Sequence, residues 1–273
     1  MSRITEIFRN LQERGERAFI PFLTAGDPTI EISEQLIVEL DKNGADIIEV
    51  GIPYSDPLAD GPTIQDAALR ALNGGVTMPD VLEMVRRIRP QVQAALVLFT
   101  YANLVFSWGM ERFFQTAKEI GVNGVIIPDL PLEESQEALQ YAKEAGVDLI
   151  PLVAPTSQER IAKICAQGQG FIYCVGALGV TGVREKLHED LPNIIMSVKN
   201  NTDLPVAVGF GVGTPEHAEA IGRYADGVVV GSAIVKRVAV VADALATGDA
   251  ALVEQKKREL IEFAAALKAP LRA

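Results

Sequence analysis

Two carboxylates, eleven residues apart, are the side chains of this chain best suited to acid–base chemistry. Glu49 lies in the apolar segment 47–50, and Asp60 lies in the following loop, which is rich in proline and glycine. A carboxyl group in apolar surroundings loses its hydration, which raises its pKa and lets it donate and accept protons near neutrality. Two acids held in unlike surroundings therefore indicate general acid–base catalysis.

Each acid also has a structural interpretation. Glu49 fits a strand-end glutamate satisfied by a backbone or hydroxyl partner, and Asp60 fits a capping residue for the helix predicted over 63–72. The loop between them is stiffened by three prolines, Pro53, Pro57 and Pro62. Such rigidity favours aiming a carboxylate at a substrate, so the catalytic and structural interpretations both stand for these residues taken singly.

The elements that must position these acids repeat along the chain. Eight short apolar or β-branched runs are predicted as strands, over 18–23, 46–50, 95–99, 124–127, 148–152, 171–175, 205–208 and 227–230. Amphipathic helices lie between them, for example over 29–43 and 132–145, and several end at a glycine such as Gly44, Gly121 or Gly146. Alternation on the second strand directs Ile48 and Val50 outward under helices and Glu49 inward.

This pattern predicts an α/β fold with one domain over residues 1–273, a (β/α)8 TIM barrel. Two further helices are expected, one at the N-terminus over 4–14 and one in the tail over 253–267. A doubly wound open sheet is the rival, although it usually has fewer strands and often a Gly-x-Gly-x-x-Gly motif after the first. The connections after strands 2 and 6 are enlarged, and such loops build the active site of a barrel.

Two glycine-containing loops follow predicted strands 7 and 8. They lie over 209–214 and 231–234, and each leads into a predicted helix. Glycine lets the backbone approach an anion closely, and the first N–H groups of a helix favour negative charge. Barrels often bind phosphate between these two loops, so we expect a phosphate site there, with ordinary tight turns as the alternative.

The loop after predicted strand 6, over 176–184, has three glycines and one charged side chain, Arg184. This composition favours a lid over a packed connection, and a plain disordered loop is the alternative. Tyr173, just before it, either fills the core or presents its hydroxyl to the barrel mouth.

Composition excludes several classes of function. The net charge of −11 argues against nucleic acid or a membrane surface as the main partner, and the sequence has neither a secretory segment nor an apolar run long enough to cross a membrane. Cys165 and Cys174 are expected to be buried and reduced, which is typical of a cytoplasmic protein. The two histidines, His188 and His217, do not indicate a metal site, and no predicted strand carries a lysine for Schiff-base chemistry.

The segment over 48–62 resembles the signature of the tryptophan synthase alpha subunit family. The resemblance extends, in order, to Pro21-Phe22-Leu23-Thr24-Ala25-Gly26-Asp27-Pro28, Tyr101-Ala102-Asn103, Pro128-Asp129-Leu130-Pro131, Gly179-Val180-Thr181-Gly182, Gly209-Phe210-Gly211 and Gly231-Ser232-Ala233. It implies a carbon–carbon lyase of tryptophan biosynthesis that cleaves indole-3-glycerol phosphate to indole and glyceraldehyde 3-phosphate. In that reaction Glu49 would be the acid–base residue, and Asp60 would stabilise charge at the indole N–H.

The resemblance also implies the remaining contacts. The substrate would be held by Phe22, Phe99, Tyr173, Thr181, Gly182, Gly211, Gly231 and Ser232, with Thr181 closing on Asp60. A beta subunit, expected in an α2β2 assembly, would receive indole and carry pyridoxal phosphate, so this chain needs no cofactor of its own. The partner would face Asp56, Pro57, Asn103 and Pro131.

One departure from the family pattern lies in the loop over 176–184. This chain has Gly176 and Ala177 at positions that often carry serine and then a basic or polar residue. It motivates a second hypothesis, a weakly active subunit that chiefly activates a beta partner. A third hypothesis is a stand-alone enzyme that releases indole without a partner.

Overall fold

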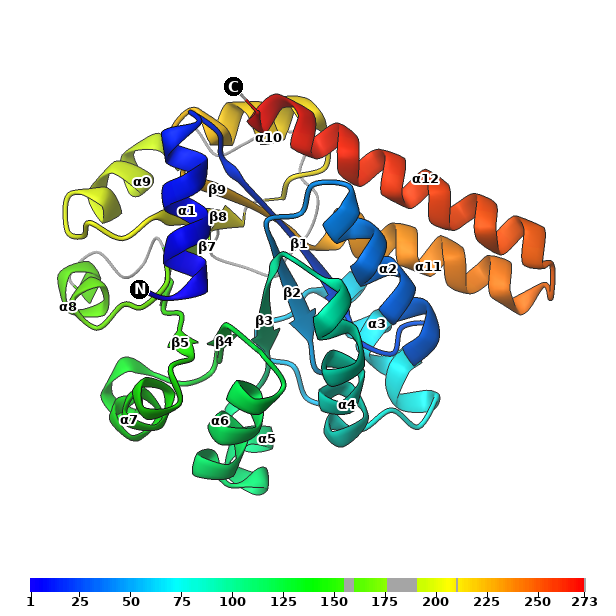
Figure 1. Cartoon of the computed structure of the whole chain (residues 1–273), viewed down its shortest axis with the longest axis horizontal. Coiled ribbons are helices and arrows are strands. Elements are labelled where there is room, and N and C mark those ends of the chain that lie inside the picture. Colours follow the sequence, from blue (N-terminus) through cyan, green and yellow to red (C-terminus); the bar gives the residue numbers. More distant parts are fainter. Residues whose placement is uncertain (155–159, 176–190, 210, 273) are drawn as a thin grey trace.

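The computed structural model describes residues 1–154, 160–175, 191–209 and 211–272 (Figure 1). Within these ranges one sheet of parallel strands forms the centre, in the order β5-β4-β3-β2-β1-β9-β8-β7-β6. The strands are β1 (Ala18–Thr24), β2 (Ile47–Gly51), β3 (Ala95–Phe99), β4 (Gly124–Ile126), β5 (Asp148–Leu149), β6 (Leu152–Val153), β7 (Ile172–Val175), β8 (Val206–Gly209) and β9 (Gly227–Val230).

The two ends of this strand order are halves of one continuous stretch. The N–H of Ile150 donates to the carbonyl oxygen of Val125 at 2.9 Å, and the N–H of Tyr173 donates to that of Pro151 at 3.0 Å. The stretch thus pairs with β4 on one side and with β7 on the other, which closes the sheet. Pro151 has no N–H for the ladder, so the single strand predicted over 148–152 is interrupted there. The predicted (β/α)8 barrel is confirmed.

Helices cover the outside of this sheet (Figure 1). They are α1 (Arg3–Glu13), α2 (Ile30–Lys42), α3 (Pro62–Asn73), α4 (Met78–Ile88), α5 (Ala102–Trp108), α6 (Met110–Glu119), α7 (Gln136–Ala145), α8 (Ile161–Ala166), α9 (Leu191–Lys199), α10 (Pro215–Gly222), α11 (Ser232–Ala246) and α12 (Ala250–Lys268). Short 3-10 turns are η1 (Arg89–Gln91), η2 (Leu132–Glu134) and η4 (Ala269–Leu271). Gly44, Gly121 and Gly146 follow α2, α6 and α7 with positive φ, as the helix-end prediction requires.

The apolar core has two parts, which follow from strand alternation. Ile48 and Val50 belong to the larger cluster between strands and helices, whereas Ile47 belongs to a smaller cluster inside the barrel. Glu49 is in register with Phe22 of β1 and Val97 of β3, so these three side chains share the inner face. The predicted inward direction of Glu49 is therefore confirmed.

Helix α1 closes the N-terminal end of the barrel. Ser2 caps it, because its hydroxyl accepts the N–H of Thr5 at 3.3 Å. Ile4, Phe8 and Leu11 form one buried face that joins the inner cluster. With that end filled by side chains, chemistry is left to the opposite end, where the strands finish.

Three local predictions need correction or completion. The helix predicted over 132–145 is η2 followed by α7, because the Ser135 hydroxyl bonds back to the Leu132 carbonyl oxygen at 2.8 Å and ends the first turn. The enlargement after β2 consists of the loop with Asp60 and the whole of α3. Strand β7 corresponds to the sixth predicted strand, over 171–175. The enlarged loop that follows it lies outside the described residues.

Candidate active site

Glu49 is the most strongly perturbed acid of the barrel interior. Its side chain is 1% exposed, and its Oε1 atom has no hydrogen-bond partner within the part of the chain that the structure describes. Burial alone raises its pKa from 4.5 to about 8. The structural interpretation of a strand-end glutamate satisfied by a hydrogen-bond partner does not hold for Oε1. A buried carboxyl that holds its proton at neutral pH and has one unpartnered oxygen is suited to exchanging protons with a bound molecule.

Asp60 is buried at the end of the loop after β2. It does not cap α3, because the N-cap residue is Gly61, which makes no side-chain capping bond. Its carboxyl is hydrogen-bonded to the hydroxyl of Tyr101 instead. Burial raises the pKa of Asp60 to about 6, and the bond from Tyr101 opposes that rise. Asp60 therefore ionises at lower pH than Glu49.

Aromatic side chains surround the two acids. Phe22 and Phe99 meet edge to face, with ring centroids 5.6 Å apart. Tyr173 of β7 extends the same inner face, and its pKa is raised by burial and by the nearby carboxylates of Glu49 and Asp60. Both carboxylates raise the pKa of the same Tyr173 hydroxyl, so both lie near it. The barrel thus brings together an acid on β2 and an acid in the loop that follows. Phe22, Phe99 and Tyr173 supply the flat apolar surface that an aromatic ring needs.

Two glycines at strand ends make room for these rings. A Cβ atom on Gly209 would lie 2.5 Å from the Tyr173 hydroxyl oxygen, and one on Gly51 would lie 2.6 Å from the ring of Phe22. Both distances are too short for any carbon–oxygen or carbon–carbon contact. At these positions the sequence therefore has glycine for packing reasons.

The predicted phosphate contacts are only partly described. Gly211 follows β8 with φ of +57°, Gly231 precedes α11, and Ser232 is its first residue. Among the described residues, a Cβ atom on Gly231 would have only Phe22 within 4 Å, at 3.9 Å, so these residues leave the position open. Thr181 and Gly182 lie outside the described residues.

The residues assigned to the partner side are at the surface. Asp56, Asn103 and Pro131 are exposed, and Pro57 is half-buried. The Asn103 amide donates to the Tyr54 hydroxyl at 3.3 Å, and Tyr54 stacks on Tyr101 with ring centroids 5.1 Å apart. This surface is thus linked through two tyrosine rings to the hydroxyl that holds Asp60.

The sequence alone did not assign roles to two residues that hold Asp60. The Tyr101 hydroxyl accepts the N–H of Ala59 at 3.3 Å in addition to bonding Asp60, and the Gln65 amide donates to the Asp60 carbonyl oxygen at 2.8 Å. In the sequence, Tyr101 is part of the motif Tyr101-Ala102-Asn103, which by itself indicates no contact with Asp60. Tyr101 follows β3 and Asp60 follows β2, and these two strands pair in parallel, so the residues after them lie at the same edge of the sheet. This pairing is the sequence signal that could have indicated the contact.

Other chemistries find little support in the part of the chain that the structure describes. It contains no group of three or more histidine, cysteine or acidic side chains arranged to bind a metal ion. Its lysines all lie outside the strands, and both cysteines are buried and free. No described helix is long and apolar enough to cross a membrane. His217 lies in α10, and His188 is outside the described residues.

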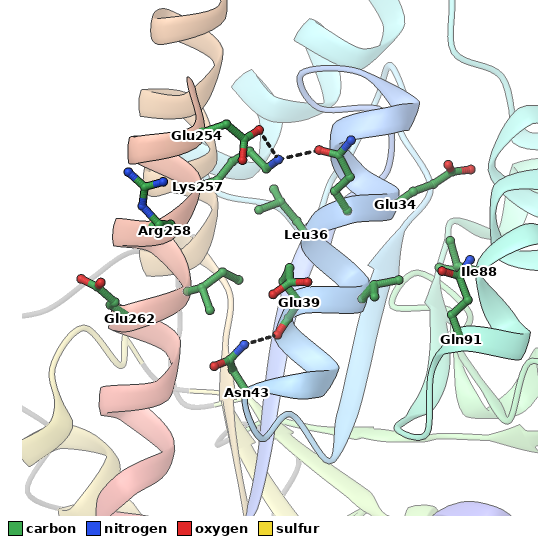
Figure 2. Close-up of a pocket in the computed structure, with 13 residues that line it drawn as sticks. Glu34, Leu36, Glu39, Asn43, Ile88, Gln91, Glu254, Lys257, Arg258 and Glu262 are labelled. Atoms are coloured by element: carbon green, nitrogen blue, oxygen red, sulfur yellow. Dashed lines mark hydrogen bonds and ion pairs between the residues drawn. The ribbon is translucent and has the colours of Figure 1, made fainter. Parts of the chain in front are cut away.

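A groove of about 540 Å³ lies on the outer helix layer, between α2, the end of α4 and α12 (Figure 2). The Lys257 ammonium group donates to Glu254 at 2.7 Å and to Gln35 at 2.6 Å. Figure 2 shows Lys257 beside Glu254 on α12, pointing toward α2. Glutamates on both walls surround this neutralised lysine. The groove includes neither Glu49 nor Asp60 nor any predicted site residue.

Comparison with known proteins shows the family to which this chain belongs. The family model described as tryptophan synthase alpha chain matches residues 8–268. The tryptophan synthase alpha chain of Geobacillus kaustophilus (strain HTA426) is 49% identical over 258 residues, covering 93% of this chain and 94% of that one. That of Thermoanaerobacter sp. (strain X514) is 48% identical over 239 residues, covering 88% and 91%.

Solved structures give the same result. A structure of Mycobacterium tuberculosis tryptophan synthase superposes with a TM-score of 0.89 at 36% identity, covering 100% of this chain and 99% of that one. The tryptophan synthase subunit alpha of Legionella pneumophila str. Paris gives 0.86 at 32% identity, covering 99% and 98%. Because both the sequence and the barrel match over nearly their full length, this chain belongs to the tryptophan synthase alpha chain family.

Proposed function

We propose that this chain catalyses the retro-aldol cleavage of indole-3-glycerol phosphate to indole and glyceraldehyde 3-phosphate. The observation that carries the proposal is Glu49, a buried carboxyl at the end of β2 whose Oε1 atom has no hydrogen-bond partner among the described residues. Family membership supports the same assignment. The reaction is a redistribution of protons and one electron pair, so two carboxylates are sufficient for it.

Glu49 is proposed to move the protons at the bond that breaks. In its protonated form it donates to C3 of the indole ring, which makes C3 tetrahedral. As carboxylate it then takes the proton of the glycerol hydroxyl, and the O–H electrons form the aldehyde while the C–C bond electrons return to the ring. Glu49 ends in its starting state. A pKa of about 8 keeps the proton in place at neutral pH and still permits its transfer.

Asp60 is proposed to stabilise the charge at the other end of the ring. Protonation at C3 places positive charge on the indole nitrogen, and an ionised carboxylate at the N–H lowers the energy of that intermediate. With a pKa of about 6, Asp60 is ionised at neutral pH while Glu49 is not. The unlike pKa values therefore assign unlike roles to the two acids.

Substrate binding is proposed to use two parts of the barrel mouth. The indole ring would lie among Phe22, Phe99 and Tyr173, whose arrangement leaves both acids beside it. The phosphate would be bound by Gly182, Gly211, Gly231 and Ser232, with Thr181 closing over Asp60. The open space at Gly231 and the first N–H groups of the fifteen-residue helix α11 support this for the described residues.

The partner is proposed to be a beta subunit that carries pyridoxal phosphate and takes up the released indole, in an α2β2 assembly. Asp56, Pro57, Asn103 and Pro131 would face it. Leu58, which is 87% exposed, and Phe106, which is 52% exposed, support an interface on this side. We further propose that the chain acts as one catalytic domain, needs no cofactor of its own and works in the cytoplasm.

The function is tested by indole release from indole-3-glycerol phosphate. Wild type, Glu49→Gln and Asp60→Asn are compared, with Glu119→Gln as a control because Glu119 is an exposed acid at the end of α6. Loss of the general acid is expected to lower kcat by about 10²-fold or more in Glu49→Gln. Equal rates in wild type and both site variants would rule out the proposed reaction.

Titration with the cognate beta subunit separates the alternatives that the sequence left open. A lyase rate that is negligible alone and in complex, together with strong activation of the beta reaction, would favour a subunit that chiefly activates its partner. High turnover that the partner does not change would favour a stand-alone indole-releasing enzyme.

A further inference from the structure

A buried ion pair joins the loop after β1 to helix α3. Asp27 is 1% exposed, and its two carboxylate oxygens accept hydrogen bonds from Nε and Nη2 of Arg70, each at 2.8 Å. Two parallel bonds between planar groups fix orientation as well as distance. Arg70 lies in the third turn of α3, so this contact determines where that helix lies relative to the barrel.

The loop that carries Asp27 is itself held in place. The Ser33 hydroxyl accepts the N–H of Gly26 at 3.0 Å and donates to the Asp27 carbonyl oxygen at 3.3 Å. Gly26 has φ of +81°, and a Cβ atom there would lie 2.6 Å from a methyl carbon of Val76, just beyond α3. The loop therefore presents a fixed carboxylate to Arg70 and also packs against the chain that leaves α3.

The other end of α3 leads directly to Asp60. The Gln65 amide donates to the Asp60 carbonyl oxygen at 2.8 Å, and Ile64 and Ala67 pack on Phe22. The chain before Asp60 gives little support, because four of the five residues over 55–59 are exposed. Since a helix is stiff along its length, a displacement of α3 is transmitted to Asp60.

We infer that Arg70 is a positioning residue of the lyase reaction, an inference that rests on the proposed function. The ion pair between Arg70 and Asp27 holds α3 in place. Helix α3, together with Gln65, then sets the position of the Asp60 carboxyl. Arg70 does not contact the substrate in this inference. It acts on the reaction only through Asp60.

The test compares Arg70→Met, Arg70→Lys and Asp27→Asn. The methionine keeps most of the side-chain length and removes both hydrogen bonds, whereas the lysine keeps the charge without the paired geometry. Arg87→Met is the matched control, because Arg87 also joins two helices through an ion pair, with Glu34, but is half-exposed and far along the chain from Asp60. Folding of each variant is checked by urea denaturation before kinetics.

We expect kcat for indole release to fall about tenfold in Arg70→Met and Asp27→Asn, less in Arg70→Lys, and within about twofold of wild type in Arg87→Met. The decisive measurement repeats Arg70→Met in the Asp60→Asn background. A residue that acts through Asp60 causes little further loss there, whereas a general structural role gives the same loss in both backgrounds. Equal losses, or a folded Arg70→Met with a wild-type kcat, would overturn the inference.

A second readout does not depend on catalysis. NMR titration of the Asp60 carboxyl is expected to show a pKa closer to that of an exposed aspartate in Arg70→Met than in wild type, because the displaced side chain regains water. An unchanged titration in the folded variant contradicts the inference even if wild type releases no indole, so its failure is distinguishable from failure of the proposed function. If Arg70→Met does not fold, Arg70→Lys is measured in the same way.

Discussion

The hydroxyl of Tyr101 is bonded to the carboxyl of Asp60, and it accepts the backbone N–H of Ala59 at the same time. Tyr101 is 2% exposed and follows β3, whereas Asp60 follows β2. The interaction with Tyr101 lowers the pKa of Asp60 against the rise that burial causes, so a residue that follows the neighbouring strand favours the ionised form of this acid.

Removal of this hydroxyl should change the pH dependence of the reaction. The bond from Tyr101 lowers the pKa of Asp60, so Tyr101→Phe raises it above about 6. Because the ionised form of Asp60 is required, kcat/KM falls as pH falls through this pKa, and the acid limb should move up by about one pH unit in the variant. Tyr54→Phe is the control, since its hydroxyl bonds Asn103 instead. Coincident acid limbs in wild type and Tyr101→Phe would contradict the prediction.

The burial of Glu49 should make the stability of the protein depend on pH. Its pKa is about 8 in the folded state and 4.5 ordinarily, so the folded protein binds the proton more tightly. Wild type therefore loses stability relative to Glu49→Gln as pH rises from about 4.5 to about 8, at about 1.4 kcal/mol for each unit of pKa difference. Urea unfolding of both proteins at several pH values measures the difference, with Glu119→Gln as the control. A difference independent of pH would show that Glu49 is not perturbed.

The Tyr173 side chain lies so close to Gly209 that a larger residue at position 209 should destabilise the protein, and shortening Tyr173 should restore part of the stability. Gly209→Ala places a methyl group against the Tyr173 hydroxyl, and overpacking of this kind costs about 1–3 kcal/mol of unfolding free energy. Tyr173→Phe removes the oxygen at 2.5 Å but leaves ring carbons at 2.8 and 3.0 Å, so the double variant should recover part of the loss. Thermal or urea denaturation of the four proteins forms the cycle, and strict additivity would argue against the contact.

A buried lysine should stabilise the N-terminal end of the barrel. Lys268, at the end of α12, is 3% exposed, and its ammonium group bonds Asp46 at 2.9 Å and the Arg17 carbonyl oxygen at 3.0 Å. Lys268→Met leaves the Asp46 carboxylate, which is only 16% exposed, without this counter-charge, which should cost about 2–4 kcal/mol of unfolding free energy. Lys256→Met, which removes an exposed pair with Glu259, should cost less than about 1 kcal/mol. The prediction is refuted if urea denaturation gives the same loss of unfolding free energy in Lys268→Met and in Lys256→Met.

Much of the barrel could be predicted because its signals are local. The alternation along 47–50 directs Glu49 inward in any barrel, and glycines such as Gly44 and Gly146 end helices by their own conformational freedom. Prediction failed where one residue interrupted a pattern, as Pro151 does in a strand and Ser135 at the start of α7. For Asp60, local sequence also allowed a helix cap, and the structure excludes that role because Gly61 is the N-cap residue of α3.

The sequence by itself determined the order of strands and helices, the inward direction of Glu49 and the family, because periodicity and short motifs are properties of neighbouring residues. Tertiary structure decided what holds the acids. The partners are far apart along the chain, 42 residues between Ala59 and Tyr101 and 43 between Asp27 and Arg70. Such pairs meet only when the parallel strands align and the barrel closes. The same closure buries Glu49 and Asp60 to different degrees and gives them different hydrogen-bond partners, which sets their pKa values apart.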